Sequence, residues 1–187
     1  MAADFVLHKI AHYLDILPRV IGQWVAWLCI FLVLSVFFTV IMRYVFNQPS
    51  ILLQEAGIWM HSMIFMLGIA YTLADDEHVR VDIFYRSASK KQQQLTDLLG
   101  TLFLLMPVCF YLISNSWHYV MISWRIGERS SEVGGLPGLY LLKSLLLVLP
   151  ILLSLQGLSI ILRSICRLKG WSCPDEFAQQ TKLKGEI

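Results

Sequence analysis

One cluster of four acidic residues and a histidine could bind a metal ion. This acidic cluster lies between two apolar runs and consists of Asp75, Asp76, Glu77, His78 and Asp82. Carboxylates and imidazole are ligands of divalent cations. However, arginines lie among these acids, and the D-x-D-x-D-G spacing of calcium loops is absent. From Val79 onward the segment alternates apolar and charged residues, as a short extended strand does. We therefore interpret residues 75–94 as a solvated or docking loop rather than a metal site.

Two histidines form a second candidate site. His61 and His118 each lie six residues inside one end of an apolar run, at matching depth if both runs cross a membrane. Helical membrane bundles can hold haem between two such histidines. A histidine that bonds a serine or a carbonyl of a neighbouring helix would have the same spacing. Both interpretations stay open, the first as a cytochrome-type membrane anchor.

No other chemistry is indicated by the sequence. Cys29 and Cys109 lie inside apolar runs, Cys166 and Cys173 flank the last run, and no C-x-x-C pair occurs. A net charge of +2, without a basic run interleaved with aromatic residues, argues against a nucleic-acid partner. We predict a chain that is not an enzyme, with no catalytic residue, no cofactor and no bound metal.

The elements that carry these residues are predicted from four charge-free runs. With 57% hydrophobic residues, the chain is too apolar for an ordinary soluble domain. Residues 20–42, 56–74, 98–124 and 144–162 contain no Asp, Glu, Lys or Arg. About 20 apolar helical residues cross a bilayer core of roughly 30 Å, and the runs lack the alternation of barrel strands. The fold class is therefore an all-α integral membrane protein with four transmembrane helices.

Three regions follow from this pattern. Residues 1–19 are predicted to form an amphipathic interfacial helix that Pro18 breaks. Residues 20–166 form the transmembrane domain, with spans of about 20–45, 53–75, 95–124 and 138–165. Residues 167–187 are a polar tail. The third span is longer than a hydrocarbon core, which predicts strong tilt or protrusion, and Pro107 and Pro150 permit kinks.

The distribution of lysine and arginine predicts the orientation. Eleven of the 15 lie before the first span, between the second and third, or after the fourth, and four lie on the other side. Cytoplasmic loops carry the excess of these residues. Both termini and the 75–94 loop are therefore expected in the cytoplasm.

Charged residues at the outer boundary are candidates for a structural role. Arg43 ends the first span and Glu55 begins the second, so an ion pair could hold this hairpin. Independent snorkelling of both side chains to the headgroups is the alternative. Lys143, early in the fourth span, could reach an acidic headgroup or Glu55.

The segment RYVFNQPSILLQEAGIWMHSMIFMLGIAYTLADDEHVRVDIF, residues 43–84, resembles a known family. It is similar to the small, DctQ-type membrane subunit of tripartite ATP-independent periplasmic (TRAP) transporters, and the resemblance covers roughly residues 20–165. The matching residues, which the resemblance makes candidates for subunit contacts or structural roles, are Arg43, Glu55, Trp59, Gly68, His78, Val79, Val81, Asp82 and Pro137.

The resemblance also implies a function. In such a transporter a periplasmic binding protein delivers an organic acid to a large, elevator-type membrane subunit that holds substrate and sodium. The small subunit would be a non-pore partner in the bacterial inner membrane that braces the large subunit's scaffold and contacts membrane lipids. The absence of ionisable residues in the middle of the spans agrees with a non-pore role. A membrane scaffold unrelated to transport is a further alternative.

Overall fold

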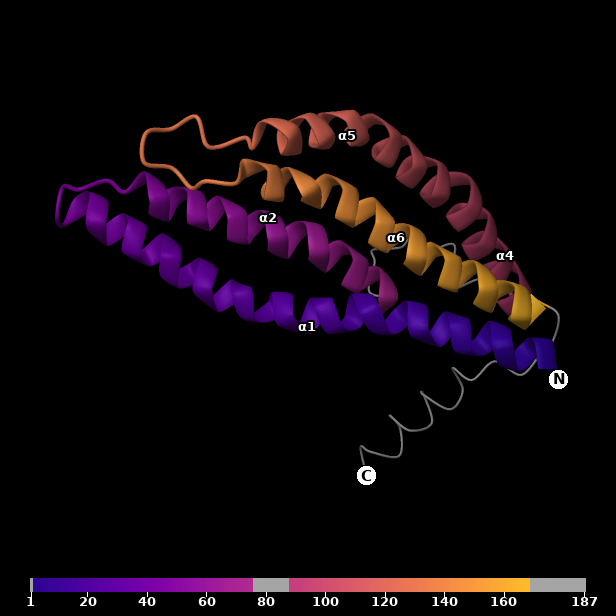
Figure 1. Cartoon of the computed structure of the whole chain (residues 1–187). Helices are drawn as coiled ribbons and strands as arrows, with labels where there is room; N and C mark the ends of the chain where they lie inside the picture. The colour runs from indigo at the N-terminus through magenta and orange to yellow at the C-terminus, as the bar shows by residue number, and fades with distance from the viewer. Residues whose placement is uncertain (1, 76–87, 169–187) are drawn as a thin grey trace, which may run out of the picture.

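The computed structural model describes residues 2–75 and 88–168, and they form long helices (Figure 1). In chain order these are α1 (Ala2–Tyr44), α2 (Ile51–Ala74), α4 (Lys90–Gly100), the π-helical turn η1 (Thr101–Leu105), α5 (Met106–Ile126) and α6 (Leu139–Leu168). Helices α4, η1 and α5 are consecutive and make one rod. Four segments are long and apolar enough to cross a membrane: Leu17–Tyr44, Ile51–Ala74, Lys91–Ile126 and Leu139–Leu168. The prediction of a four-span helical membrane protein is confirmed.

In the view of Figure 1 the helices follow one another as a row in the order α5, α6, α2 and α1. Helix α6 is the central member, because it contacts each of the other three spans. Helix α6 packs against α1, α2 and the α4–η1–α5 rod, and 39% of its most apolar window is buried, against 11% or less for the other three spans. The central contact joins Ala70 of α2, Cys109 of α5 and Leu152 and Leu153 of α6. Most apolar surface of the other helices therefore faces outward, toward lipid or toward another protein.

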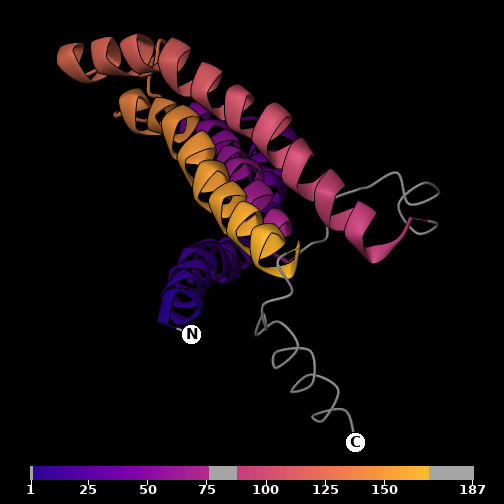
Figure 2. The ribbon, with the colours of Figure 1, turned by 90° about the vertical axis from the view of Figure 1, so that its right-hand side faces the viewer.

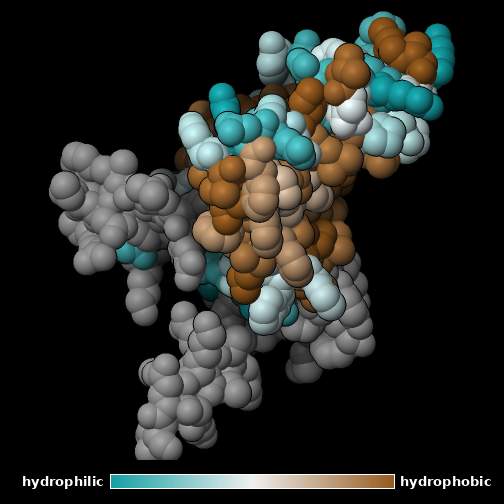
Figure 3. Space-filling model, turned by 90° about the vertical axis from the view of Figure 1, so that its left-hand side faces the viewer, coloured by the Kyte–Doolittle hydropathy of each residue, from teal (hydrophilic) through white to brown (hydrophobic). Residues whose placement is uncertain are grey.

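The two ends of the row differ. The end with residues 45–50 and 127–138, here the hairpin end, lies opposite the end where α1 and α4 begin and α6 finishes, here the termini end (Figure 1). At the hairpin end, hydrophilic residues gather beside a broad hydrophobic area (Figure 3). Val45, Phe46 and Val133, all outside the helices, are exposed there. Both ends of the described chain thus lie at one end of the bundle, and their location in the cytoplasm stays a prediction.

The break predicted at Pro18 is absent. Helix α1 continues through this proline, so no separate helix ends there. Proline removes one backbone hydrogen bond from a helix. However, Pro18 is fully buried. Packing around its ring can stabilise the continuous helix, whereas a break would expose further backbone groups. That the first part of α1 lies on a membrane surface stays a prediction. The predicted tail, apart from Arg167 and Leu168, lies outside the described residues.

The third span is the longest, as predicted. Its 36 residues correspond to about 54 Å of helix at 1.5 Å per residue. The predicted irregularity near Pro107 is a π turn: the Met106 N–H bonds to the Thr101 carbonyl, five residues back. Proline has no N–H to donate, and a π turn lets the helix continue past it. Helix α6 crosses this turn at Gly157, where a Cβ atom would come within 3.0 Å of Leu105.

Candidate functional site

Glu55 ties the loop between the third and fourth spans to α2. One of its carboxylate oxygens, Oε2, accepts a hydrogen bond of 2.5 Å from the Leu136 N–H. The other, Oε1, accepts one from the hydroxyl of Ser130. Gly135 leaves room for this contact, because a Cβ there would lie 2.7 Å from Oε1 and 2.4 Å from the Ser130 hydroxyl oxygen. The carboxylate thus anchors residues 130–136, and we call this contact the Glu55 anchor.

The ion pair proposed between Arg43 and Glu55 is wrong. Arg43 is exposed, and its guanidinium carbon lies 5.9 Å from the centroid of the Tyr44 ring. No ion pair joins it to Glu55, although the structure describes both residues. The reason lies in the helix period. The Leu53 carbonyl bonds Ser35 of α1 and so marks the side of α2 that faces α1. Glu55, two residues on, points about 200° around the helix axis, toward the loop.

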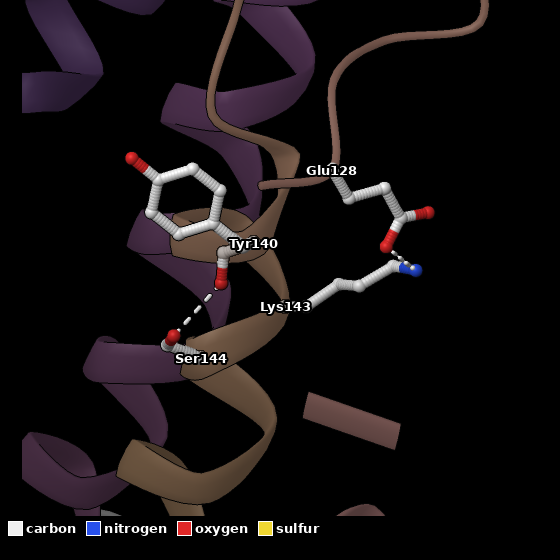
Figure 4. Close-up of polar contacts among 4 residues, drawn as sticks. All are labelled: Glu128, Tyr140, Lys143 and Ser144. Atoms are coloured by element: carbon white, nitrogen blue, oxygen red, sulfur yellow. Dashed lines mark hydrogen bonds and ion pairs between the residues drawn. The ribbon is translucent and has the colours of Figure 1, made fainter. Parts of the chain in front are cut away.

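Lys143 pairs with Glu128 rather than with Glu55. Its ammonium nitrogen lies 2.5 Å from Oε2 of Glu128 (Figure 4) and 4.1 Å from the centroid of the Tyr119 ring. This places the first turn of α6 beside the last two turns of α5. The hydrogen bond from Lys143 stabilises the carboxylate and lowers the pKa of Glu128.

A second contact joins the same two helices. The Trp124 indole N–H donates to the Ser144 hydroxyl over 2.8 Å, and that hydroxyl donates to the Tyr140 carbonyl (Figure 4). The Trp124 and Tyr140 rings lie 4.7 Å apart between centroids. Three sets of polar contacts therefore fix the hairpin end: the Glu55 anchor, the pair of Lys143 with Glu128, and the bond of Trp124 to Ser144. Of their carboxylate, hydroxyl and ammonium groups, the sequence predicted a role only for Glu55 and Lys143.

The acidic cluster is described only at its first member. Asp75 forms an ion pair with Arg19 of α1, with 3.1 Å between Oδ1 and the guanidinium Nε. The same guanidinium also donates a hydrogen bond to the Ala74 carbonyl. This joins α1 to the end of α2 at the termini end. Three residues further along α1, a Cβ on Gly22 would lie 2.3 Å from the Tyr71 ring, so the two helices touch there.

The remaining residues predicted from the sequence have varied positions. Trp59 is half-buried and its ring lies 3.8 Å from where a Cβ of Gly138 would be. A Cβ on Gly68 would meet nothing within 4 Å, so within this chain no close packing requires a glycine there. Pro137 is exposed in the loop before α6. His78, Val79, Val81 and Asp82 lie outside the described residues, and so does the predicted docking strand.

The two histidines do not face each other across a helix pair. His61 of α2 and His118 of α5 are both exposed, and α6 packs between their helices (Figure 1). In the described parts of the chain, no group of three His, Cys, Asp or Glu side chains is placed to hold a metal ion. The geometry therefore gives no support to a haem held between these two residues.

The pairing of Lys143 with Glu128 predicts a dependence of stability on pH. Because the pKa of Glu128 is lowered from 4.5 in the folded protein, its contribution is present above pH 4.5 and is lost as the pH falls through the folded value. We expect the gap in unfolding temperature between wild type and Glu128→Gln to shrink as the pH is lowered from 7 to 3.5, measured in detergent. In a Lys143→Gln background the same substitution should produce a smaller gap, because the hydrogen bond that contributes most to the lowered pKa of Glu128 is gone. A gap that stays constant with pH would contradict the prediction.

The architecture defines a multi-pass helical membrane protein. The polar contacts described above join its own helices and loops. A model of the family "Tripartite ATP-independent periplasmic transporters, DctQ component" matches residues 32–167. This is more than half of the chain, and the chain belongs to that family, which is the small component of these transporters. Comparisons with curated proteins and with solved structures found no match.

Proposed function

We propose that this chain is the non-pore, bracing subunit of a sodium-coupled, binding-protein-dependent transporter for organic acids. Its partners would be a large elevator-type membrane subunit, a periplasmic binding protein and the surrounding lipids. Sodium and substrate would bind to the large subunit, and this chain would carry no catalytic activity and no cofactor. Its location would be the bacterial cytoplasmic membrane, with both termini inside.

The uncharged interior of the bundle carries this proposal. The polar residues buried among residues 17–75 and 88–168 are all neutral: Thr101, Ser123, Gln156, Ser159 and Ser164. Proton relays and ion pathways in membranes use ionisable groups that face the bundle interior. A helical bundle with a neutral interior fits a static partner better than a coupled pathway.

The fixed hairpin end also supports a bracing role. The loop of residues 127–138 is tied to α2 by the Glu55 anchor and to α6 through Glu128 and Lys143. Elevator transport requires one domain to move while another stays in place. Helices joined by anchored loops suit the stationary part.

Reconstitution into proteoliposomes tests the proposal. This chain alone should give no uptake of a radiolabelled organic acid above empty vesicles. The same chain with its large subunit and binding protein should give uptake that depends on an inward sodium gradient. Vesicles with the large subunit and binding protein but without this chain serve as the control, and uptake there should fall to background. Transport by this chain alone, or full transport without it, would contradict the proposal.

A further inference from the structure

The outer face of α5 is unusual because it presents polar groups within a membrane span. Tyr111, Ser114 and His118 follow one another at spacings of three and four residues, which puts them on one face of the helix. Asn115 lies beside them, and all four are exposed. We call this set the α5 polar seam.

The α5 polar seam lies at hydrocarbon depth. Tyr111 is the midpoint of the charge-free residues 98–124. His118, the member furthest from it, is seven residues along the helix, which corresponds to about 10 Å. The half-thickness of a hydrocarbon core is roughly 15 Å. The seam is therefore within the span rather than in the loop beyond it.

Apart from one bond of Asn115, the side chains of Ser114, Asn115 and His118 have no hydrogen-bond partner within the described chain. The Asn115 side-chain amide donates to the Tyr111 carbonyl over 2.9 Å, which uses one of its donors and none of its acceptors. Ser114 and His118 form no hydrogen bond with any residue in 2–75 or 88–168. Lipid tails offer neither donors nor acceptors, so such groups cost free energy in contact with them. In membrane proteins, residues of these types face other helices and bond to them.

The opposite edge of the row has a different surface. Helix α1 exposes large apolar side chains between its tryptophans and Arg43, among them Phe31, Val33 and Phe37, while Ser35 and Thr39 turn inward and bond backbone carbonyls. Such a surface suits lipid. Helix α2 exposes His61 between Ile58 and Phe65, and the neighbouring Ser62 hydroxyl is bonded to the Ile58 carbonyl. Gln23 of α1 and Gln54 of α2 are exposed as well, but each lies near one end of its span. Among the described spans, α5 is therefore the one that exposes several polar groups near its middle.

Exposed aromatic side chains lie beside the seam. Phe110 and Trp117, seven residues apart on α5, are 73% and 55% exposed. A spacing of seven residues keeps two side chains on one stripe of a helix, which a second helix can contact. The aromatic surface thus suits a helical partner, and the polarity of the seam indicates that the partner supplies hydrogen bonds.

We propose that the α5 polar seam packs against a transmembrane helix of the large transporter subunit, and that the outer face of α1 contacts lipid. This inference rests on the proposed function for the identity of the partner. It assigns the contact to one edge of the row. Because α5 lies at the end of the row (Figures 1 and 2), a helix can approach it without displacing any helix of this chain.

Photo-crosslinking from the two edges tests the inference. The photoreactive amino acid p-benzoylphenylalanine would be placed at Ser114 or His118 on α5, and at Val33 or Phe37 on α1 as matched exposed controls, in cells that also make the large subunit. We expect a covalent adduct with the large subunit from both α5 positions and none from either α1 position. Adducts from α1 alone, adducts between two copies of this chain, or no protein adduct from α5 while the large subunit co-purifies would overturn the inference but leave the proposed function standing. If the large subunit does not co-purify at all, both are overturned.

An apolar seam provides a second measurement. The variant Ser114→Leu/Asn115→Leu/His118→Leu keeps the surface hydrophobic and removes the hydrogen bonds. Because these side chains are exposed, the variant should insert and unfold in detergent as the wild type does. Its association with the large subunit should weaken roughly ten- to thirtyfold, as expected for the loss of two or three interhelical hydrogen bonds. Unchanged association would contradict the inference.

Discussion

Replacing Glu55 by alanine is expected to release residues 130–136 from α2. The substitution removes the acceptors of the Leu136 N–H and the Ser130 hydroxyl. A hydrogen bond to a charged group contributes about 1.5–3 kcal/mol, so the two together should lower the free energy of unfolding by about 3 kcal/mol. Glu55→Gln keeps one acceptor and should lose about half as much. Thermal unfolding in detergent, at equal detergent and protein concentration, measures both effects.

Two controls separate this anchor from a general effect of charge. Arg43→Gln should change the free energy of unfolding by less than about 0.5 kcal/mol, because the exposed guanidinium does not contact Glu55. Glu132→Gln removes an exposed carboxylate from the same loop and should be equally mild. Arg43→Gln as damaging as Glu55→Ala would show that the two side chains do interact, contrary to the structure.

Replacing Gly22 by alanine is expected to separate α1 from the end of α2. The added Cβ would lie 2.3 Å from Cγ and 2.6 Å from Cβ of Tyr71, and the second of these atoms is fixed to the α2 backbone. The helices must therefore move apart. Overpacking of this kind costs about 1–3 kcal/mol, and the ion pair of Arg19 with Asp75 lies within the same contact. We expect a lower unfolding temperature and poorer assembly with the large subunit.

A matched glycine and a compensating variant test the cause. Gly68→Ala lies on α2, where a Cβ meets nothing within 4 Å, and should leave the stability of the isolated chain unchanged. Tyr71→Ala combined with Gly22→Ala should restore part of the stability lost by Gly22→Ala, because the smaller side chain removes the ring that the new Cβ meets. Equal damage from Gly22→Ala and Gly68→Ala would contradict the packing explanation.

The spans could be predicted from the sequence because their signal is local. A charge-free run of about 20 residues identifies a crossing without knowledge of its neighbours. The continuous helix through Pro18 could not be predicted, because burial of that ring is a tertiary effect. The four helices that are long and apolar enough to cross a membrane, by contrast, begin and end within a few residues of the predicted spans.

The polar contacts were predicted less well because their partners are distant or are backbone groups. Glu55 was identified from its position at the boundary, but one of its partners is a backbone N–H 81 residues away, which no residue type reveals. Lys143 was identified in the same way, while Glu128 lies in the segment GERSSEVGG, which reads only as a polar turn. The α5 polar seam was visible as isolated polar residues in a span. It gained meaning only when the structure showed that they face outward together.

The length of the third span has a consequence for the membrane around the protein. Even at a tilt of about 40°, near the upper end of the usual range, a rod of about 54 Å covers about 41 Å along the bilayer normal. A hydrocarbon core of roughly 30 Å cannot contain it, so about 10 Å must stand in the headgroup layers or beyond. Helix α4 (Lys90–Gly100), with its two lysines and three glutamines, is chemically suited to that layer. The tilt of the α4–η1–α5 rod would then depend on the thickness of the bilayer. The rate of transport should therefore change in vesicles made from lipids with longer acyl chains.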